Sequence, residues 1–472
     1  MKQLNIVLLC LLFLAARPLF AQNGAVISGS ITSPLTSQVE VVQRPNEFIP
    51  EEQTLEAELE GNKFILRVPI DKPTVVELLH GDEVVPVYLE PGYELKLQAK
   101  GSKFLKSLKY KGKGADENNY LVSYTTRFEE EEDYQVLPDN VKLREQEFTQ
   151  FLDYRRQDQV KSLEKYAAKR ALSDTFKEYL LAEIEFSYAK DKLNYHSLRQ
   201  QILQVALAKP SPAFYSFLVD LNLERPENLI SPAFASFLRS YTVYMAQAAG
   251  YTKANEAYYS GSYNTAATQL KGKALLLAQA QILWQSIQFG HLQYTEQMLK
   301  DFAARNTDAA ANDYLLEFYS ANKDFAIGSP APDFTLKDVN GQPVSLSDFK
   351  GKLVYLNFWR STCGLCQMEL PHMQDLIARL KGRKVVFLNV ALDEDEAKWR
   401  RKVQEKQLLG EHLFQQGPDA ALVQQYNLKD TPAYFLIDEE GRFITLKARR
   451  PSDHEVANEI LRHLEVRQAS LK

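Results

Sequence analysis

Two cysteines separated by two residues are the strongest chemical signal in this sequence. Cys363 and Cys366 enclose Gly364-Leu365 and follow an apolar segment, 353–359, with the composition of a buried strand. If a helix begins after the turn, a thiolate on Cys363 faces unpaired backbone N–H groups and the positive end of the helix dipole. We therefore expect Cys363 to be a nucleophile and Cys366, one helical turn further on, to resolve the mixed disulfide.

A carboxylate stands three residues after the second cysteine. Glu369 would share a helix face with Cys366, where it is placed to exchange the proton of the resolving thiol. The alternative is an acid near the helix start that only stabilises the dipole. His372 would leave a zinc site incomplete, so we expect no metal at this pair.

The third cysteine belongs to an expected export signal. Lys2 precedes an apolar run, 6–16, that includes Cys10, and Ala21 offers a small residue for cleavage. The run is too short to span a membrane, although an uncleaved anchor is the alternative. Removal of 1–21 would leave only the CxxC pair, which excludes a framework of structural disulfides.

Length and charge narrow the remaining possibilities. At about 150 residues per domain, a chain of 472 residues suggests three domains. The formal net charge is −5, and the sequence contains no dense stripe of basic residues. Nucleic acid and anionic membrane surfaces are therefore not expected partners.

The hydrophobic pattern changes twice along the chain. Range 22–114 alternates apolar and polar residues in short runs between turn residues, which predicts an antiparallel, β-sandwich-like domain. Range 115–325 has a helical period and predicts an all-α domain. Range 326–472 opens with two prolines and then alternates strands and helices, which predicts an α/β domain.

Local signals also place particular helices in the central range. Ser211-Pro212 and Ser231-Pro232 each combine an N-cap serine with a proline at the first helical position, so both are expected to start a helix. Long stretches with a helical pattern lie around 141–169, 175–188, 265–289 and 295–304.

The last domain resembles the thioredoxin-like thiol–disulfide reductases of the TlpA and ResA type. The resemblance covers about 327–466 and rests on these segments: Gly328-Ser329-Pro330-Ala331-Pro332-Asp333-Phe334, Asn357-Phe358-Trp359, Cys363-x-x-Cys366-x-x-Glu369-x-Pro371, and Thr431-Pro432 before Tyr434-Phe435-Leu436-Ile437-Asp438. It implies a thioredoxin fold in which Cys363 attacks, Cys366 resolves and Glu369 is the buried acid. Upstream, the β-domain looks like a small domain of unknown function that often accompanies such chains.

The resemblance also concerns the residues around the dithiol. It implies that Thr431-Pro432 forms a cis turn facing the cysteines, whereas a trans bond is the default for an X–Pro pair. We expect the substrate to contact five residues: Thr362, Gly364, Leu365, Thr431 and Pro432. One departure is Thr362 itself, because the family usually carries tryptophan immediately before the first cysteine.

The function that follows is disulfide reduction in the periplasm or cell envelope. The expected partners are disulfide- or thiol-bearing exported proteins, including apocytochromes c in cytochrome c biogenesis, and a membrane thiol electron donor. No organic cofactor is implied beyond the redox-active Cys363–Cys366 disulfide. A thiol peroxidase would need Pro-x-x-x-Thr/Ser-x-x-Cys, and Arg360 breaks that pattern. The non-enzymatic alternative is a client-binding scaffold with a vestigial redox domain.

Overall fold

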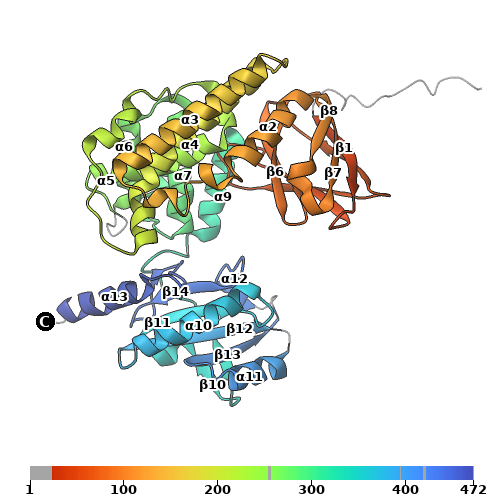
Figure 1. Ribbon diagram of the computed structural model, residues 1–472. Coiled ribbons are helices and arrows are strands. Elements are labelled where there is room, and N and C mark those ends of the chain that lie inside the picture. Colours follow the sequence, from red (N-terminus) through yellow and green to blue (C-terminus); the bar gives the residue numbers. More distant parts are fainter. Residues whose placement is uncertain (1–23, 253–256, 394, 418–420, 471–472) are drawn as a thin grey trace, which may run out of the picture. The chain divides into compact units, whose positions relative to one another are not determined.

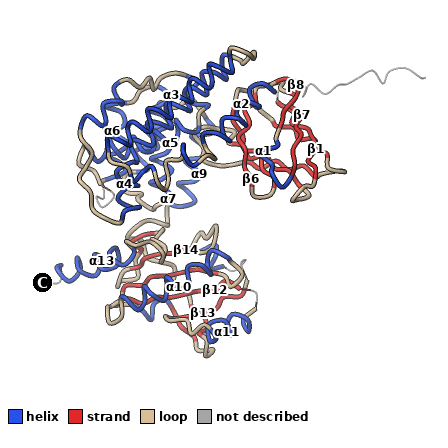
Figure 2. Tube along the Cα trace, viewed as in Figure 1, coloured by secondary structure: helices blue, strands red, loops and turns tan. Residues whose placement is uncertain are grey.

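The computed structural model describes residues 24–252, 257–393, 395–417 and 421–470, so the expected signal, 1–21, lies outside the described residues. The chain divides into two compact units, Met1–Gln281 and Ile282–Lys472 (Figure 1). β-sheets come first, helices follow, and a sheet with helices ends the chain (Figure 2). This multi-domain architecture confirms the predicted fold class. The domain ranges drawn from the sequence stay predictions.

Two sheets make up the N-terminal part of the first unit. Their strand orders are β4-β1-β7-β8 and β3-β2-β5-β6, and every pair is antiparallel except β1 with β7, which run parallel. Alternate residues such as Ile27, Val41 and Leu78 enter one buried core, because every second side chain of a strand points to the same face. The strands are β1 Ala25–Thr32, β2 Gln38–Gln43, β3 Gln53–Glu58, β4 Lys63–Val68, β5 Thr74–His80, β6 Glu83–Leu89, β7 Glu94–Lys100 and β8 Lys109–Lys113.

Helices continue the same core beyond the sheets. Tyr120 of α2, Leu163 of α3 and Phe176 of α4 belong to the same buried cluster as the strand residues. The helices are α1 Phe104–Ser107, α2 Ala115–Phe128, α3 Glu145–Ala167, α4 Asp174–Leu203, α5 Pro232–Ala248, α6 Tyr258–Gln269 and α7 Gly272–Gln288.

The structure adds detail to the predicted helical stretches. The stretch at 265–289 contains parts of two helices, α6 and α7, which are separate because Leu270 has extended backbone angles and Gly272 has a φ of 53°. Ser231 caps α5 as predicted, since its side chain accepts the backbone N–H of Phe234. Ser211 is also the N-cap residue of a helix that begins at Pro212, as predicted, but this helix is 3₁₀, and the Ser211 side chain accepts no backbone N–H and donates its hydroxyl to Glu145.

The second unit is built on one mixed sheet with the order β10-β9-β13-β12-β11-β14-β15. β11 lies between a parallel neighbour, β12, and an antiparallel neighbour, β14, and all its residues are buried. Its central place explains the continuous apolar run in the sequence. The strands are β9 Thr335–Asp338, β10 Pro343–Ser345, β11 Leu353–Trp359, β12 Val385–Asp393, β13 Glu411–Gln416, β14 Ala433–Ile437 and β15 Phe443–Thr445.

Helices cover both faces of this sheet. Met373 of α10 and Ala457 of α13 pack with Tyr355 on one face, whereas Leu422 of α12 packs with Leu356 on the other. The helices of the second unit are α8 Thr295–Arg305, α9 Ala309–Asn322, α10 Gly364–Arg379, α11 Glu396–Glu405, α12 Ala421–Gln425 and α13 Val456–Ser470. None of the helices in the described ranges is both long enough and apolar enough to cross a membrane.

Candidate active site

The CxxC pair lies where β11 passes into α10. Cys363 is the N-cap of α10, and its Sγ accepts the backbone N–H of Cys366 at 3.0 Å. The two cysteines form a disulfide with their Cα atoms 5.2 Å apart. A sulfur in this position lies at the positive end of the helix dipole and accepts a hydrogen bond from a backbone N–H. Both interactions stabilise negative charge on the sulfur.

The two sulfurs differ in their access to solvent. Cys363 is half-buried, whereas the residue of Cys366 is only 2% exposed. Cys366 packs with Trp359 and Trp399 below the turn. A protein substrate can therefore approach Cys363 but not Cys366.

The predicted substrate-contacting residues surround Cys363. The Thr431–Pro432 bond is cis, and the carbonyl oxygen of Thr431 lies 3.5 Å from Sγ of Cys363. Thr362 and Gly364 are exposed beside the same cysteine, and Leu365 is half-buried. The structure thus brings these residues together, while their contact with substrate stays a prediction.

Glu369 is buried, and both oxygens of its carboxylate are occupied. Ser452 donates its backbone N–H to Oε2 at 2.9 Å and its hydroxyl to Oε1 at 2.7 Å. Glu369 is 6% exposed and follows the buried Cys366 by three residues on α10. Its catalytic role stays a prediction. Ser452 was missed, since it lies 83 residues away and no local spacing links the two.

A second polar cluster holds the turn that leads to the cysteines, and sequence reasoning missed it too. The carboxylate of buried Asp393 accepts the backbone N–H of Ser361 at 2.8 Å and its hydroxyl at 3.0 Å. The carbonyl oxygen of Ser361 accepts hydrogen bonds from Lys402 and Gln367, each at 2.9 Å. Burial lowers the pKa of Lys402, while the charge of Asp393 acts in the opposite direction.

One sequence signal for this cluster was available. Asp393 ends β12, and Ser361 follows the end of β11. These two strands are parallel, so their carboxyl ends meet at one edge of the sheet. A buried acid at that edge is therefore a candidate to hold the CxxC turn, once the pairing of the two strands is assumed.

Replacing Asp393 with alanine should lower the free energy of unfolding of the second unit by about 3 kcal/mol, because the buried N–H of Ser361 would lose its charged acceptor. Tryptophan fluorescence during urea unfolding measures this, because Trp284, Trp359 and Trp399 all lie in the second unit. Asp375→Ala, at an exposed position of α10, is the control. An equal loss in both variants would contradict a special role for Asp393.

Among the described residues, His, Cys, Asp and Glu side chains do not gather in groups that could hold a metal ion. His372 is exposed on α10. The groups that the structure places at this site are two sulfurs, one carboxylate and the backbone around them.

This arrangement places the second unit among the thioredoxin-fold thiol–disulfide oxidoreductases. Residues 327–444 match the AhpC/TSA family. Thiol-disulfide oxidoreductase ResA of Bacillus cereus (strain ATCC 10987 / NRS 248) is 32% identical over 127 residues, which are 27% of this chain and 72% of the relative. The chain belongs to this ResA family of thiol–disulfide oxidoreductases, and it is an enzyme that acts on protein thiols and disulfides.

Two further proteins are similar to part of this chain. ResA of Geobacillus kaustophilus (strain HTA426) is 36% identical over 124 residues, covering 26% of this chain and 70% of the relative. The solved thioredoxin domain of a thiol-disulfide oxidoreductase from Bacteroides vulgatus is 28% identical, with a TM-score of 0.28, and the match covers 29% of this chain and 98% of that one.

Proposed function

We propose that this protein is an exported reductase that uses the Cys363–Cys366 pair to reduce disulfides in other proteins of the periplasm or cell envelope. The expected signal at 1–21 supports export. A membrane thiol donor would return two electrons to the oxidised pair after each turnover. Such a donor is needed because each reaction leaves Cys363 and Cys366 as a disulfide.

The observation that carries the proposal is the hydrogen bond from the Cys366 backbone N–H to Sγ of Cys363 at 3.0 Å. This contact stabilises a thiolate on Cys363 relative to the thiol, because a donor favours the charged form. The half-buried Cys363 is also the sulfur that a protein substrate can reach. Sγ of Cys363 is thus both the atom whose negative charge is stabilised and the sulfur that a substrate can reach.

The reaction then has two exchange steps. The Cys363 thiolate attacks one sulfur of the client disulfide, so a mixed disulfide forms and the other client sulfur leaves as a thiolate. Cys366 loses its proton to Glu369 and attacks Cys363, which forms the Cys363–Cys366 disulfide and releases the second client thiolate. That thiolate takes up the proton. Two electrons have then passed from the enzyme to the client.

Apocytochromes c are one class of client that this chemistry fits. Their haem-attachment segment is a CxxCH sequence, whose two cysteines must be reduced thiols before haem is joined. An exposed Thr362 beside Cys363, in place of a tryptophan, leaves room for an extended segment of that kind.

The redox potential of the pair tests the direction of electron flow. We expect a value near about −270 mV in glutathione or dithiothreitol buffers, the range of thioredoxin. A value near about −120 mV would make the protein an oxidant and overturn the proposal. Cys366→Ser should in parallel trap mixed disulfides on Cys363, and reduced apocytochrome c peptides should appear only with the unaltered protein.

A further inference from the structure

The buried carboxylate of Glu369 has one partner that donates to both of its oxygens. The backbone N–H and the hydroxyl of Ser452 contact Oε2 and Oε1 at 2.9 and 2.7 Å. Two donors on a carboxylate favour its ionised form over the neutral acid. A serine hydroxyl can also rotate and accept a proton, whereas the backbone N–H can only donate. Ser452 can therefore remain bonded to Glu369 in either protonation state.

Ser452 lies on a segment, 448–453, that is fixed to the sheet at its start. Ala448 donates its N–H to the carbonyl oxygen of Tyr434 on β14 at 2.9 Å. Next to it, the hydroxyl of Tyr355 on β11 donates to the carbonyl oxygen of Arg449 at 2.6 Å. Burial raises the pKa of Tyr355 well above its ordinary value, so this hydroxyl remains a donor. The segment thus leaves the sheet in a defined direction.

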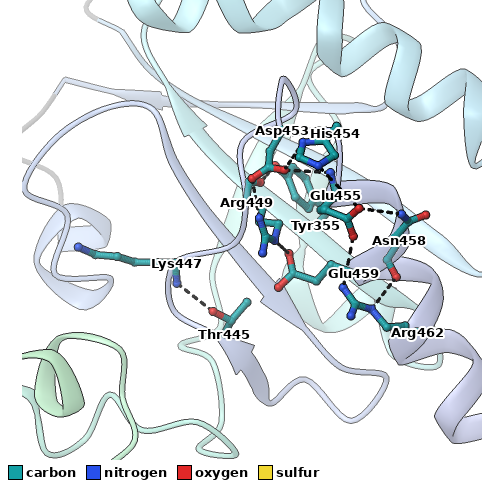
Figure 3. Close-up of polar contacts among 10 residues, drawn as sticks. All are labelled: Tyr355, Thr445, Lys447, Arg449, Asp453, His454, Glu455, Asn458, Glu459 and Arg462. Atoms are coloured by element: carbon teal, nitrogen blue, oxygen red, sulfur yellow. Dashed lines mark hydrogen bonds and ion pairs between the residues drawn. The ribbon is translucent and has the colours of Figure 1, made fainter. Parts of the chain in front are cut away.

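The other end of segment 448–453 is tied to α13. Figure 3 shows the Arg449 guanidinium between Asp453 and Glu459, at 2.7 and 3.6 Å. Asp453 also accepts the backbone N–H of Glu455 at 2.9 Å, at the approach to α13. Because both ends are held, the position of Ser452 over Glu369 follows from the fold of the second unit.

Other titratable groups face the same carboxylate. Tyr355 of β11 and Tyr434 of β14 interact with Glu369 electrostatically, and burial raises the pKa of both phenols, so they remain neutral. On α10 itself, Cys366 is the neighbouring group one turn away. The charged Arg449, Arg450, Asp453 and Glu459 belong to the segment and to α13. Ser452 is the neighbour that touches both oxygens.

We propose that Ser452 is a positioning residue that holds the Glu369 side chain one helical turn from Cys366 and thereby controls the resolution of the mixed disulfide. The inference rests on the proposed function of the Cys363–Cys366 pair. In the resolving step the Cys366 thiol gives its proton to Glu369, the Cys366–Cys363 bond forms, and the bond from Cys363 to the client sulfur breaks. The released client thiolate then removes the proton from Glu369.

The test uses the reduced full chain and the aromatic disulfide dithiobis(nitrobenzoate). The first thionitrobenzoate released reports attack by Cys363, and the second reports resolution by Cys366. For Ser452→Ala, the rise of the second rate with pH should move upward by about one unit, because a lost donor to the carboxylate favours the protonated acid. Below that rise the second rate should fall about tenfold, which corresponds to about 1.4 kcal/mol. The first rate should not change.

Matched variants separate positioning from general damage. Ser452→Thr keeps a hydroxyl and should restore the wild-type profile. In Glu369→Gln the rise that depends on the carboxylate should be absent, so that the rate increases only at higher pH, where the Cys366 proton leaves to hydroxide, and adding Ser452→Ala should change nothing further, since coupled residues are not additive. A Ser452→Ala profile that overlays the wild type, or a shift that persists in the Glu369→Gln background, overturns the role of Ser452. A wild-type protein that releases only the first thionitrobenzoate overturns the proposed dithiol mechanism instead.

Discussion

Cys363→Ser should lose disulfide reduction by at least about a thousandfold. A serine hydroxyl stays protonated at neutral pH and forms no disulfide, so neither exchange step can occur. The substitution should leave the fold intact, because a serine oxygen can accept the Cys366 N–H as the N-cap of α10 just as the sulfur does. The measurement is the steady-state reduction of a peptide disulfide by the full chain with excess dithiothreitol.

Cys366→Ser is the matched control for this variant. It keeps the exposed nucleophile, so the first exchange should proceed and stop at a stable mixed disulfide. If Cys363→Ser and Cys366→Ser behaved alike in the first exchange, the assignment of Cys363 as the attacking sulfur would be wrong. The scaffold alternative would be favoured by two results together. The wild type would reduce no disulfide, and Cys363→Ser would bind client proteins as tightly as the wild type does.

Glu369→Gln should slow resolution of the mixed disulfide about a hundredfold while the first exchange keeps its rate. The amide cannot take the proton of Cys366 at this position. It can still accept the N–H of Ser452 through its oxygen and donate to the hydroxyl through its nitrogen, so both contacts survive. Stopped-flow measurement of the two thionitrobenzoate releases separates the steps.

Glu405→Gln makes the same chemical change at an exposed position of α11 and serves as the control. It should leave both rates at their wild-type values. A Glu369→Gln protein that resolves its mixed disulfide at the wild-type rate would leave the carboxylate with the purely dipole-stabilising role considered from the sequence. A fall in both rates would point to damage of the fold rather than to loss of proton transfer.

The chemistry of the site was readable from residues that are close in sequence. An apolar run, a short turn and two cysteines at a helical spacing predicted a strand and a helix that starts at Cys363, and β11, α10 and the N-cap position of Cys363 confirm this. The role of Cys363 as nucleophile stays a prediction. Glu369 was identified for the same reason, because residues three apart share a helix face. Such spacings depend only on local backbone geometry.

Local signals predicted where helices start but not their type. A helix begins after both Ser211 and Ser231, and both hydroxyls donate to a distant glutamate, but only Ser231 also accepts a backbone N–H of its helix, and the helix after Ser211 is 3₁₀. The break between α6 and α7, within the stretch 265–289, was not predicted either.

The sequence by itself determined the order of sheet, helical and α/β regions, the reactive pair and its neighbouring acid. Only the tertiary structure decided what holds them. Thr431 lies 68 residues from Cys363, Asp393 lies 32 from Ser361, and Ser452 lies 83 from Glu369. The physical reason is that these contacts depend on which strands pair and on which distant loop packs against the site. The periodicity of a single segment predicts neither.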